Sequence, residues 1–381
     1  LIHQSCKNAA AKAIDRERCS VIDKIAEGGF NKIFLVSSDD GHEAIARIPT
    51  PIAGPPRYTT ASEVATLDFL RNTLGIPVPK VLAYATSSKN PVGAEYIIME
   101  RVHGESLASR WLSLTTEEVK DIMTQLTEIE QKILTFRLPG YGSLYYKHDI
   151  QGEPQLDVEG GDFCIGPVAR RQFWHGERAR MKLDRGPCEF LLDPCVGTII
   201  NALFFAGSSA EDCLISAARR EIACLLDHAK PQSRRRFLLP TEYNIDPNEH
   251  ISLLRKFLQL APLLVPTERR FHVPMLRHPD LSLANILLTP GSTKIASIID
   301  WQDSVTFPLF MQAGYPAFCE HDWSQTQSLK IPGLPEGFDN MDAGEQLHAM
   351  NKFRLEEANL YYTAATSIHN DEHLKVLRMP H

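Results

Sequence analysis

The chain has 381 residues, of which 43% are hydrophobic and 23% charged, and its formal net charge is −7. This is the composition of an ordinary globular protein with enough apolar residues for two lobes, and it excludes collagen-like and low-complexity chains. The acidic balance argues against a protein that coats nucleic acid, so we expect no nucleic-acid partner.

The first hundred residues alternate between strand-like and turn-like stretches. Runs of β-branched and apolar residues are separated by a double glycine and by an Asp-Asp-Gly turn, which predicts an antiparallel meander. The strand-like runs are 19–25, 32–37, 43–48, 80–84 and 95–100. Before the fourth run, apolar residues at helical spacing begin after Thr60, and Glu63 three residues later completes a capping box.

From residue 103 onward the pattern becomes mainly helical. A short apolar hairpin at 286–299 surrounds a Pro-Gly turn, and apolar residues elsewhere recur at helical spacing. Helices are expected after Thr115, after Asp246 and from Glu345 onward. The pattern predicts an α+β protein with a small antiparallel-sheet lobe over residues 1–102 and a large, mainly helical lobe over 103–381.

The most informative segment contains His278, Asp280 and Asn285, and Asp300 follows at the end of the apolar hairpin. A carboxylate, a side-chain amide five residues later and a second carboxylate after a hairpin recur in phosphoryl-transfer enzymes. There the first carboxylate orients the attacking hydroxyl, and the other two groups hold Mg²⁺ against the nucleotide phosphates. Alternatively, Asp280 and Asn285 are turn formers and Asp300 caps a strand end.

With the β-rich lobe upstream, these residues resemble the aminoglycoside phosphotransferase-like kinases, which share the bilobal protein-kinase-like fold. In that family the loop reads His-x-Asp-x4-Asn, and the strand that follows ends in Asp. The resemblance implies that Asp280 is the catalytic base, that Asn285 and Asp300 bind Mg²⁺, and that His278 supports the loop without reacting. It also implies ATP and Mg²⁺ as cofactors.

Gly28, Gly29, Phe30 and Asn31 lie between the first two predicted strands, where the resemblance places a phosphate-covering loop. Glycine lets backbone N–H groups approach phosphate oxygens closely, because no Cβ is in the way. The stretch is not Gly-x-Gly-x-x-Gly, and alone it would be an ordinary hairpin turn. The sequence contains no Gly-x4-Gly-Lys-[Ser/Thr] motif, which excludes P-loop enzymes at the level of motif.

Arg47 stands at the third-strand position where kinases of this fold usually carry Lys. Arg is a planar, longer cation that does not simply replace Lys at a tight site, although it can bind phosphate in bidentate fashion. The resemblance makes Glu63 its ion-pair partner, whereas the capping box assigns the same side chain to the helix terminus. We favour the ion pair.

The fifth strand-like run leads into the connection between the two lobes. By resemblance, Met99 lines an adenine pocket, while the Glu100 carbonyl and the Val102 N–H bond the edge of the base. Because backbone atoms make these bonds, the residue types are weak evidence, and an apolar edge strand would look the same.

A closer resemblance covers the chain from about Cys19 to just beyond Pro335. The matching stretches, 26–34, 46–49, 61–66, 76–80, 90–100 and 299–302, resemble the fungal branch related to altered-inheritance-of-mitochondria proteins. In that branch Arg usually replaces Lys at the third strand, and the resemblance implies a mitochondrial location. Residues 188–207 depart from the branch, because they are apolar without a clear period, and we interpret them as an insertion or as an unspliced stretch of the gene.

Cysteine usage and hydropathy bear on the compartment. The eight cysteines form no Cys-x-x-Cys pair, and no Asn begins an Asn-x-Ser/Thr sequon, which fits a reducing intracellular compartment, either mitochondrial or cytoplasmic. The longest apolar run, 196–207, is shorter than the ~20 residues of a membrane helix, so we expect no membrane span.

These observations predict an ATP- and Mg²⁺-dependent kinase that acts on a small-molecule hydroxyl. From Trp301 onward the chain carries 11 Asp/Glu against 5 Lys/Arg, which could attract a cationic acceptor or simply form a solvated helical surface. A pseudokinase, which binds nucleotide or a partner without transfer, is the alternative that Arg47 favours, and an antibiotic-modifying role comes third. A protein kinase is disfavoured, because Asp300-Trp301-Gln302 replaces Asp-Phe-Gly and no Ala-Pro-Glu segment follows.

Overall fold

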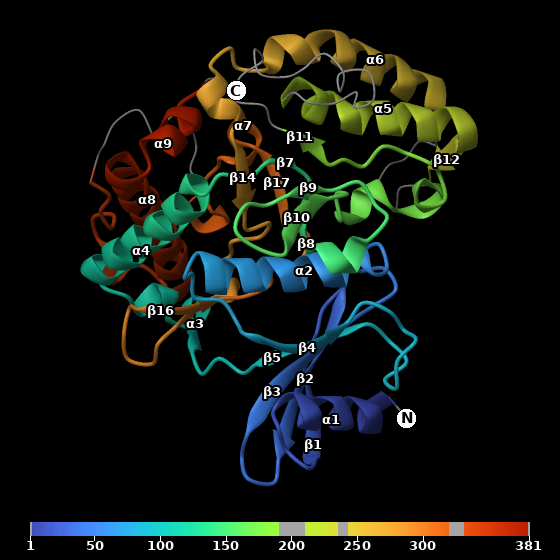
Figure 1. The fold of residues 1–381 in the computed structure, drawn as a ribbon. Coiled ribbons are helices and arrows are strands. Elements are labelled where there is room, and N and C mark those ends of the chain that lie inside the picture. The colour runs from blue at the N-terminus through green and yellow to red at the C-terminus, as the bar shows by residue number, and fades with distance from the viewer. Residues whose placement is uncertain (1, 190–209, 235–242, 320–330, 380–381) are drawn as a thin grey trace.

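The computed structural model describes residues 2–189, 210–234, 243–319 and 331–379, which form two lobes stacked one above the other in Figure 1. The small lobe holds a five-stranded antiparallel sheet with the order β1-β2-β3-β5-β4. Its strands are β1 (Cys19–Glu27), β2 (Asn31–Ser38), β3 (Glu43–Pro49), β4 (Val81–Ala85) and β5 (Tyr96–Glu100). The predicted meander and both later strands are therefore confirmed.

Strand alternation gives the sheet two different faces, because successive side chains of a strand point to opposite sides. Phe34, Val36, Ala44 and Ala46 pack against the helix α1 (Ile2–Ala13), which the sequence pattern did not predict. The residues between them in β2 and β3 face the other lobe. One side of the sheet is thus closed by a helix, and the other is available for a cavity.

The helix α2 (Tyr58–Asp68) lies between the sheet and the large lobe (Figure 1). It starts at Tyr58 after Arg57, whose side chain caps nothing, so the predicted capping box of Thr60 and Glu63 is wrong. Thr60 instead donates its hydroxyl to Glu95 Oε2 at 2.7 Å. Glu63 lies in the second turn of α2, and its side chain pairs with Arg47 of the sheet rather than with the helix terminus.

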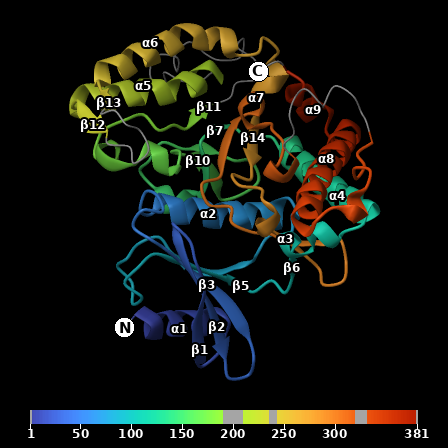
Figure 2. The same cartoon turned by 180° about the vertical axis from the view of Figure 1, so that it is seen from behind.

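The large lobe is mainly helical and also carries short strands (Figures 1 and 2). Its helices are α3 (Leu107–Arg110), α4 (Thr116–Thr135), α5 (Ala210–His228), α6 (Pro247–Leu264), α7 (Leu309–Gln312), α8 (Ala343–His369) and α9 (Asp371–Leu377). Its strands are β6 (Glu105–Ser106), β7 (Gly140–Tyr141), β8 (Ser143–Tyr146), β9 (Leu156–Asp157), β10 (Phe163–Gly166), β11 (Cys188–Glu189), β12 (Gln232–Arg234), β13 (Tyr243–Ile245), β14 (Pro274–Arg277), β15 (Ile286–Leu288), β16 (Ile295–Ile298) and β17 (Val305–Pro308). The predicted helices and the apolar hairpin, β15–β16, are confirmed.

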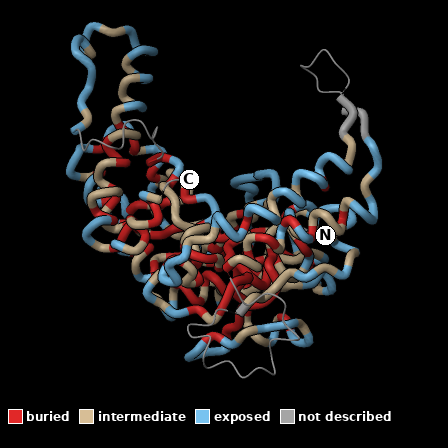
Figure 3. Tube along the Cα trace, turned by 90° about the horizontal axis from the view of Figure 1, so that it is seen from above, coloured by how far each residue is buried: buried red, intermediate tan, exposed pale blue. Residues whose placement is uncertain are grey.

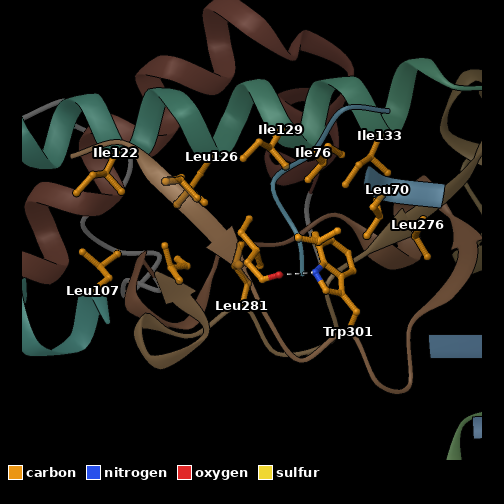
Figure 4. Packing of buried hydrophobic residues seen from close by; sticks show 14 of the residues in the cluster. Leu70, Ile76, Leu107, Ile122, Leu126, Ile129, Ile133, Leu276, Leu281 and Trp301 are labelled. Carbon is orange, nitrogen blue, oxygen red and sulfur yellow. Dashed lines mark hydrogen bonds between the residues drawn. The ribbon is translucent and has the colours of Figure 1, made fainter. Parts of the chain in front are cut away.

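The core of the large lobe forms where α4 packs against α8 and β14. A capping box of Thr115 and Glu118 starts α4, and its apolar stripe is buried along one face, as the helical spacing predicted. Figure 4 shows this stripe facing Trp301, whose indole N–H donates to the Ile298 carbonyl at 3.0 Å. The segment that carries Asp300 is therefore anchored in the core.

Buried residues gather in the middle of the molecule, and exposed residues follow its outer helices and loops (Figure 3). Within the described ranges, no helix is long and apolar enough to cross a membrane. The segment interpreted as an insertion, 188–207, lies outside the described residues except for Cys188 and Glu189, which pair with β7.

Candidate active site

A cavity of about 460 Å³ lies between the sheet of the small lobe and the β15–β16 hairpin of the large lobe. Its size is that of a small-molecule site. The structure brings together in it every residue predicted for nucleotide or metal, namely Gly28, Gly29, Phe30, Asn31, Arg47, Glu63, Met99, Glu100, Val102, Asn285 and Asp300. Asp280, the predicted base, belongs to the adjoining loop and does not line the cavity.

The apolar part of the cavity contains residues that the motifs did not single out. They are Ile25, Ile33, Ile45, Leu67, Pro79 and Ile299. Ile33 stands opposite Arg47 in the register of β2 and β3, and Ile45 stands opposite Met99 in that of β3 and β5. Strand alternation therefore places these side chains on the same face as Arg47, and this face combines an apolar slot with one cation.

The loop of Asp280 is fixed by His278, which is buried. The imidazole bonds the Ile299 carbonyl through Nε2 at 2.9 Å and accepts the Asp280 backbone N–H at Nδ1 at 3.1 Å. This pair of contacts requires the neutral tautomer with hydrogen on Nε2. Burial lowers the pKa of His278, which favours that neutral form. His278 thus supports the loop, as the sequence predicted.

Asn285 completes the loop from its other end. Its side-chain N–H donates to the Asp280 carbonyl at 2.8 Å, and its backbone carbonyl accepts the Ile299 N–H at 2.9 Å. Because the amide nitrogen is directed at Asp280, the amide oxygen is the atom that Asn285 offers toward the cavity. This hydrogen bond therefore holds the side-chain amide of Asn285 beside the backbone of Asp280.

Residues 300–303 form a tight turn after β16. Asp300 and Asp303 both have positive φ, 67° and 65°, a conformation that Asp tolerates better than most residues. The turn sends Trp301 into the core, whereas Gln302 faces the small lobe. The side chain of Asp300 is 50% exposed and reaches the cavity.

Arg47 is almost completely buried, with 5% of its surface exposed, and oxygen atoms surround its guanidinium. It pairs with Glu63 through Nη1, with Gln302 through Nη2, and with Asp300 Oδ1 at 3.1 Å through Nη2. The ion pair predicted between Arg47 and Glu63 is therefore present. Burial raises the pKa of Glu63 to about 7, against the attraction of Arg47 and with a further increase from Asp300 and Asp303.

Two contacts from the large lobe reach the glycine-containing loop. Asn31 donates its amide N–H to Gln302 Oε1 at 2.7 Å, and the Arg171 guanidinium lies over the Phe30 ring at 4.6 Å. Sequence reasoning missed both partners, because they lie 271 and 141 positions away from the loop residues that they contact. The only local signal was the departure of Gln302 from the Asp-Phe-Gly pattern.

The connection between the lobes begins at Glu100. Its carboxylate accepts from Arg71 at 2.7 Å and from the Lys80 backbone N–H at 3.0 Å. These bonds hold the side chain to one side, so the main chain from Glu100 to Val102 forms an edge of the cavity. The backbone groups there can serve a planar heterocycle as donor and acceptor.

The donor set suits a hard cation that keeps other ligands. Asn285 and Asp300 supply oxygen atoms at the cavity wall, and Mg²⁺ commonly takes one or two protein ligands and completes its shell with phosphate and water. Among the residues that the structure describes, no group of three His, Cys, Asp or Glu side chains could enclose a metal. These two residues therefore fit Mg²⁺ held jointly with phosphates better than a metal held by protein alone.

Sequence comparison relates this chain to known proteins. The model of the phosphotransferase enzyme family (APH) matches residues 21–179. A subtelomeric hrmA-associated cluster protein of Aspergillus fumigatus is 59% identical over 380 residues, which cover 97% of this chain and 74% of the relative. The chain belongs to the APH phosphotransferase family.

More distant relatives of this phosphotransferase-family chain include a protein named altered inheritance of mitochondria protein 9, mitochondrial, from Candida tropicalis. It is 26% identical over 406 residues, which cover 98% of this chain and 62% of the relative. The chain thus spans less than two thirds of that relative. The fungal branch proposed from sequence stretches is confirmed.

Solved structures of low sequence identity also match. An aminoglycoside-3'-phosphotransferase of type VIII is 14% identical with a TM-score of 0.44, covering 97% of this chain and 96% of that one. A streptomycin-ATP-APH(2")-IIa ternary complex is 13% identical with a TM-score of 0.42, covering 94% and 84%. The predicted α+β class is confirmed by the structure itself, in which an antiparallel-sheet lobe is followed by a mainly helical lobe.

Proposed function

We propose that this protein is a phosphotransferase that uses ATP with Mg²⁺ to phosphorylate the hydroxyl of a small molecule. The observation that carries the proposal is the shared cavity, in which the glycine-containing loop, Arg47, the inter-lobe connection, Asn285 and Asp300 meet beside the loop of Asp280. Arg47, Glu63 and Asp300 cluster beside the apolar lining of the cavity, a combination that suits a nucleotide with a planar base and charged phosphates.

Each group has a role that its geometry permits. The Glu100–Val102 backbone binds the base edge, and Met99 with its apolar neighbours holds the ring. The Gly29 N–H together with Arg47 binds phosphate oxygens, whereas the Gly28 N–H donates to the Asn31 carbonyl at 3.0 Å and shapes the loop. Asp280 accepts the proton of the attacking hydroxyl, and His278 keeps Asp280 in place through its backbone. Asn285 and Asp300 would hold Mg²⁺, which would supply positive charge against the phosphates.

A binding measurement tests the nucleotide site. Mg-ATP at about 100 times its dissociation constant should stabilise the protein by about 2.7 kcal/mol, which is a shift of several degrees in thermal unfolding. Asp300→Asn should lose most of that shift, because Asn tolerates the same positive φ but supplies no charge for the metal. Asp15→Asn is the matched control, since Asp15 has a φ of 57° and lies outside the cavity.

A second measurement tests transfer itself. ADP release from Mg-ATP is followed over a panel of neutral polyols and amino alcohols, which separates neutral from cationic acceptors. A parent protein that shows no thermal shift with Mg-ATP contradicts the proposed nucleotide site. A shift without ADP release for any acceptor contradicts transfer and supports the second candidate.

The second candidate is a nucleotide-binding pseudokinase. One observation favours it: the predicted metal ligand Asp300 is already paired with Arg47 at 3.1 Å. In such a protein Arg47 would hold Asp300 and the cavity would bind nucleotide without positioning the metal for transfer. Retention of Asp280 and Asn285 in a loop with defined hydrogen bonds favours the enzyme.

We further propose a mitochondrial location, on the strength of the relatives whose names contain that word. Those relatives are only about a quarter identical. Fractionation of the source cells with an antibody against the native protein tests the location, and recovery in the cytosolic fraction alone contradicts it.

A further inference from the structure

Gln302 is the residue of the large lobe through which the phosphate side of the cavity is assembled. It is 7% exposed and follows the predicted metal ligand by two positions. Its Oε1 accepts hydrogen bonds from Asn31 Nδ2 at 2.7 Å and from Arg47, and its Nε2 donates to the Ala53 carbonyl at 3.0 Å. One amide thus contacts three separate segments of the small lobe.

The chemistry of these contacts matches the needs of an arginine. A guanidinium presents several donors in a rigid plane, whereas a lysine ammonium is a compact point charge. With Glu63 on one terminal nitrogen of Arg47, the other nitrogen also needs an acceptor when it is buried. Gln302 supplies an uncharged acceptor to that nitrogen, which Asp300 Oδ1 also approaches at 3.1 Å from its half-exposed position.

The same oxygen holds Asn31, the last residue of the glycine-containing loop. Asn31 begins β2 and follows Gly28, Gly29 and Phe30 in the chain. Because Asn31 and Arg47 share one acceptor, a movement of Gln302 would displace the loop and the cation together. The bond to Ala53 fixes the amide orientation, since it uses the nitrogen and leaves the oxygen for Asn31 and Arg47.

We propose that Gln302 is a positioning residue that holds Arg47 and the Gly28–Asn31 loop in place for the phosphates of a nucleoside triphosphate. This inference rests on the proposed function, because it assumes that the cavity binds nucleotide. It assigns no contact with substrate to Gln302 itself. Gln302 then provides the acceptor that an arginine needs at the position where related kinases carry lysine.

A second glutamine provides the control for a purely structural effect. Gln312 also donates its amide to buried backbone, to the Met275 carbonyl at 3.1 Å and to the Val305 carbonyl at 2.7 Å. Both acceptors lie in the large lobe, and Gln312 does not line the cavity. Gln312→Met therefore removes comparable hydrogen bonds without touching Arg47 or Asn31.

The experiment compares adenosine with Mg-ATP as calorimetric ligands of the intact chain. Gln302→Met should weaken Mg-ATP binding by about tenfold, the effect of one lost charge-assisted hydrogen bond, and leave adenosine affinity within about twofold. Gln302→Glu keeps an acceptor oxygen but adds a charge beside Arg47, so it should also weaken Mg-ATP selectively. Gln312→Met should leave both affinities within about twofold while it lowers the urea midpoint.

The outcomes separate the possibilities. If Gln302→Met binds Mg-ATP as tightly as the parent does, this inference is overturned and the proposed function is unaffected. An equal loss of affinity for adenosine and for Mg-ATP also overturns it, because the whole cavity has then changed. A parent protein that binds neither ligand overturns the proposed function together with this inference. If Gln302→Met does not fold, Gln302→Glu carries the same comparison between the two ligands.

Discussion

The two sides of the cavity are held in different ways. The loop of Asp280 depends on bonds between near neighbours, such as His278 with the Asp280 N–H and Asn285 with the Asp280 carbonyl. The phosphate side depends on partners far apart in sequence, since Arg47 meets Gln302 across 255 positions and Asn31 meets it across 271. The spacing of residues in the sequence can predict a loop held by near neighbours. Contacts between residues far apart in the sequence form only once the two lobes have packed.

The sides also differ in burial. Asp280 is exposed and Asp300 is half exposed, whereas Arg47 and Glu63 are 5% and 4% exposed. A charge that water already solvates can be removed at little cost to the fold, but a buried charge that loses its partner cannot. We therefore expect substitution of the exposed Asp280 to affect chemistry alone and substitution of the buried Arg47 or Glu63 to affect stability too.

The largest effect should come from Asp280→Asn. Removal of the group that accepts the hydroxyl proton should lower the rate of ADP release by about 10²- to 10⁴-fold. The thermal midpoint and the Mg-ATP shift should stay at their parent values, because Asp280 is exposed and its loop bonds are made by its backbone. Initial rates and melting curves are measured on the same preparations.

Asp339→Asn is the control for Asp280→Asn, as it makes the same change at an exposed position outside the cavity. It should leave rate and stability unchanged. A thermal midpoint several degrees lower in the Asp280 variant would show that the loop depends on the Asp280 side chain for its stability. The expected difference in stability between the two sides of the cavity would then be absent.

The next effect concerns the buried ion pair. Arg47→Met leaves the Glu63 carboxylate without its cation, which should lower the free energy of unfolding by about 3 kcal/mol at pH 8. Because burial already raises the pKa of Glu63 to about 7, the loss should be smaller at pH 6, where the carboxyl takes up a proton. Urea unfolding at both pH values measures the difference.

A double variant sharpens this result. Adding Glu63→Gln to Arg47→Met removes the orphaned charge and should restore more than half of the lost stability. If the double variant is no more stable than Arg47→Met, the loss comes from packing and not from the unpaired carboxylate.

The contrast between the sides explains what the sequence could predict. The order and spacing of Asp280, Asn285 and Asp300 identified the loop, because a strand hairpin joins its parts and fixes their separation. The family resemblance likewise placed Arg47 in the third strand with Glu63 as its ion-pair partner. Arg171 carried no local signal, and Gln302 carried only its departure from the Asp-Phe-Gly pattern, since the contact of each depends on how the lobes pack.

The start of α2 shows how a local rule can mislead. Thr60 and Glu63 have the spacing of a capping box, yet the helix begins two residues earlier and both side chains bond distant groups, Glu95 and Arg47. The burial of Glu63 beside a cation outweighs the modest stability of a cap. The helix α1 was missed for a related reason, because its small residues become an apolar face only against the sheet.

The smallest predicted effect distinguishes the two sides by their response to pH. Burial lowers the pKa of His278 in the loop, so the folded protein releases a proton that the unfolded chain still holds, and this contribution to stability is lost as pH falls below about 6.5. On the phosphate side, burial raises the pKa of Asp303 to about 6 despite Arg170 and Arg171. The folded protein then keeps a proton that the unfolded chain releases, so stability falls as pH rises from about 4 to 6.

Asp303→Asn removes the second effect and leaves the first, and Asn tolerates the positive φ of this position. The free energy of unfolding of the variant relative to the parent should therefore increase by about 1 kcal/mol between pH 4.5 and pH 7.5, as measured by urea unfolding. His278 titrates equally in both proteins and cancels from the comparison. A difference that stays constant with pH would mean that Arg170 keeps Asp303 ionised throughout this range, and Asp303 would then give no pH response opposite to that of the loop.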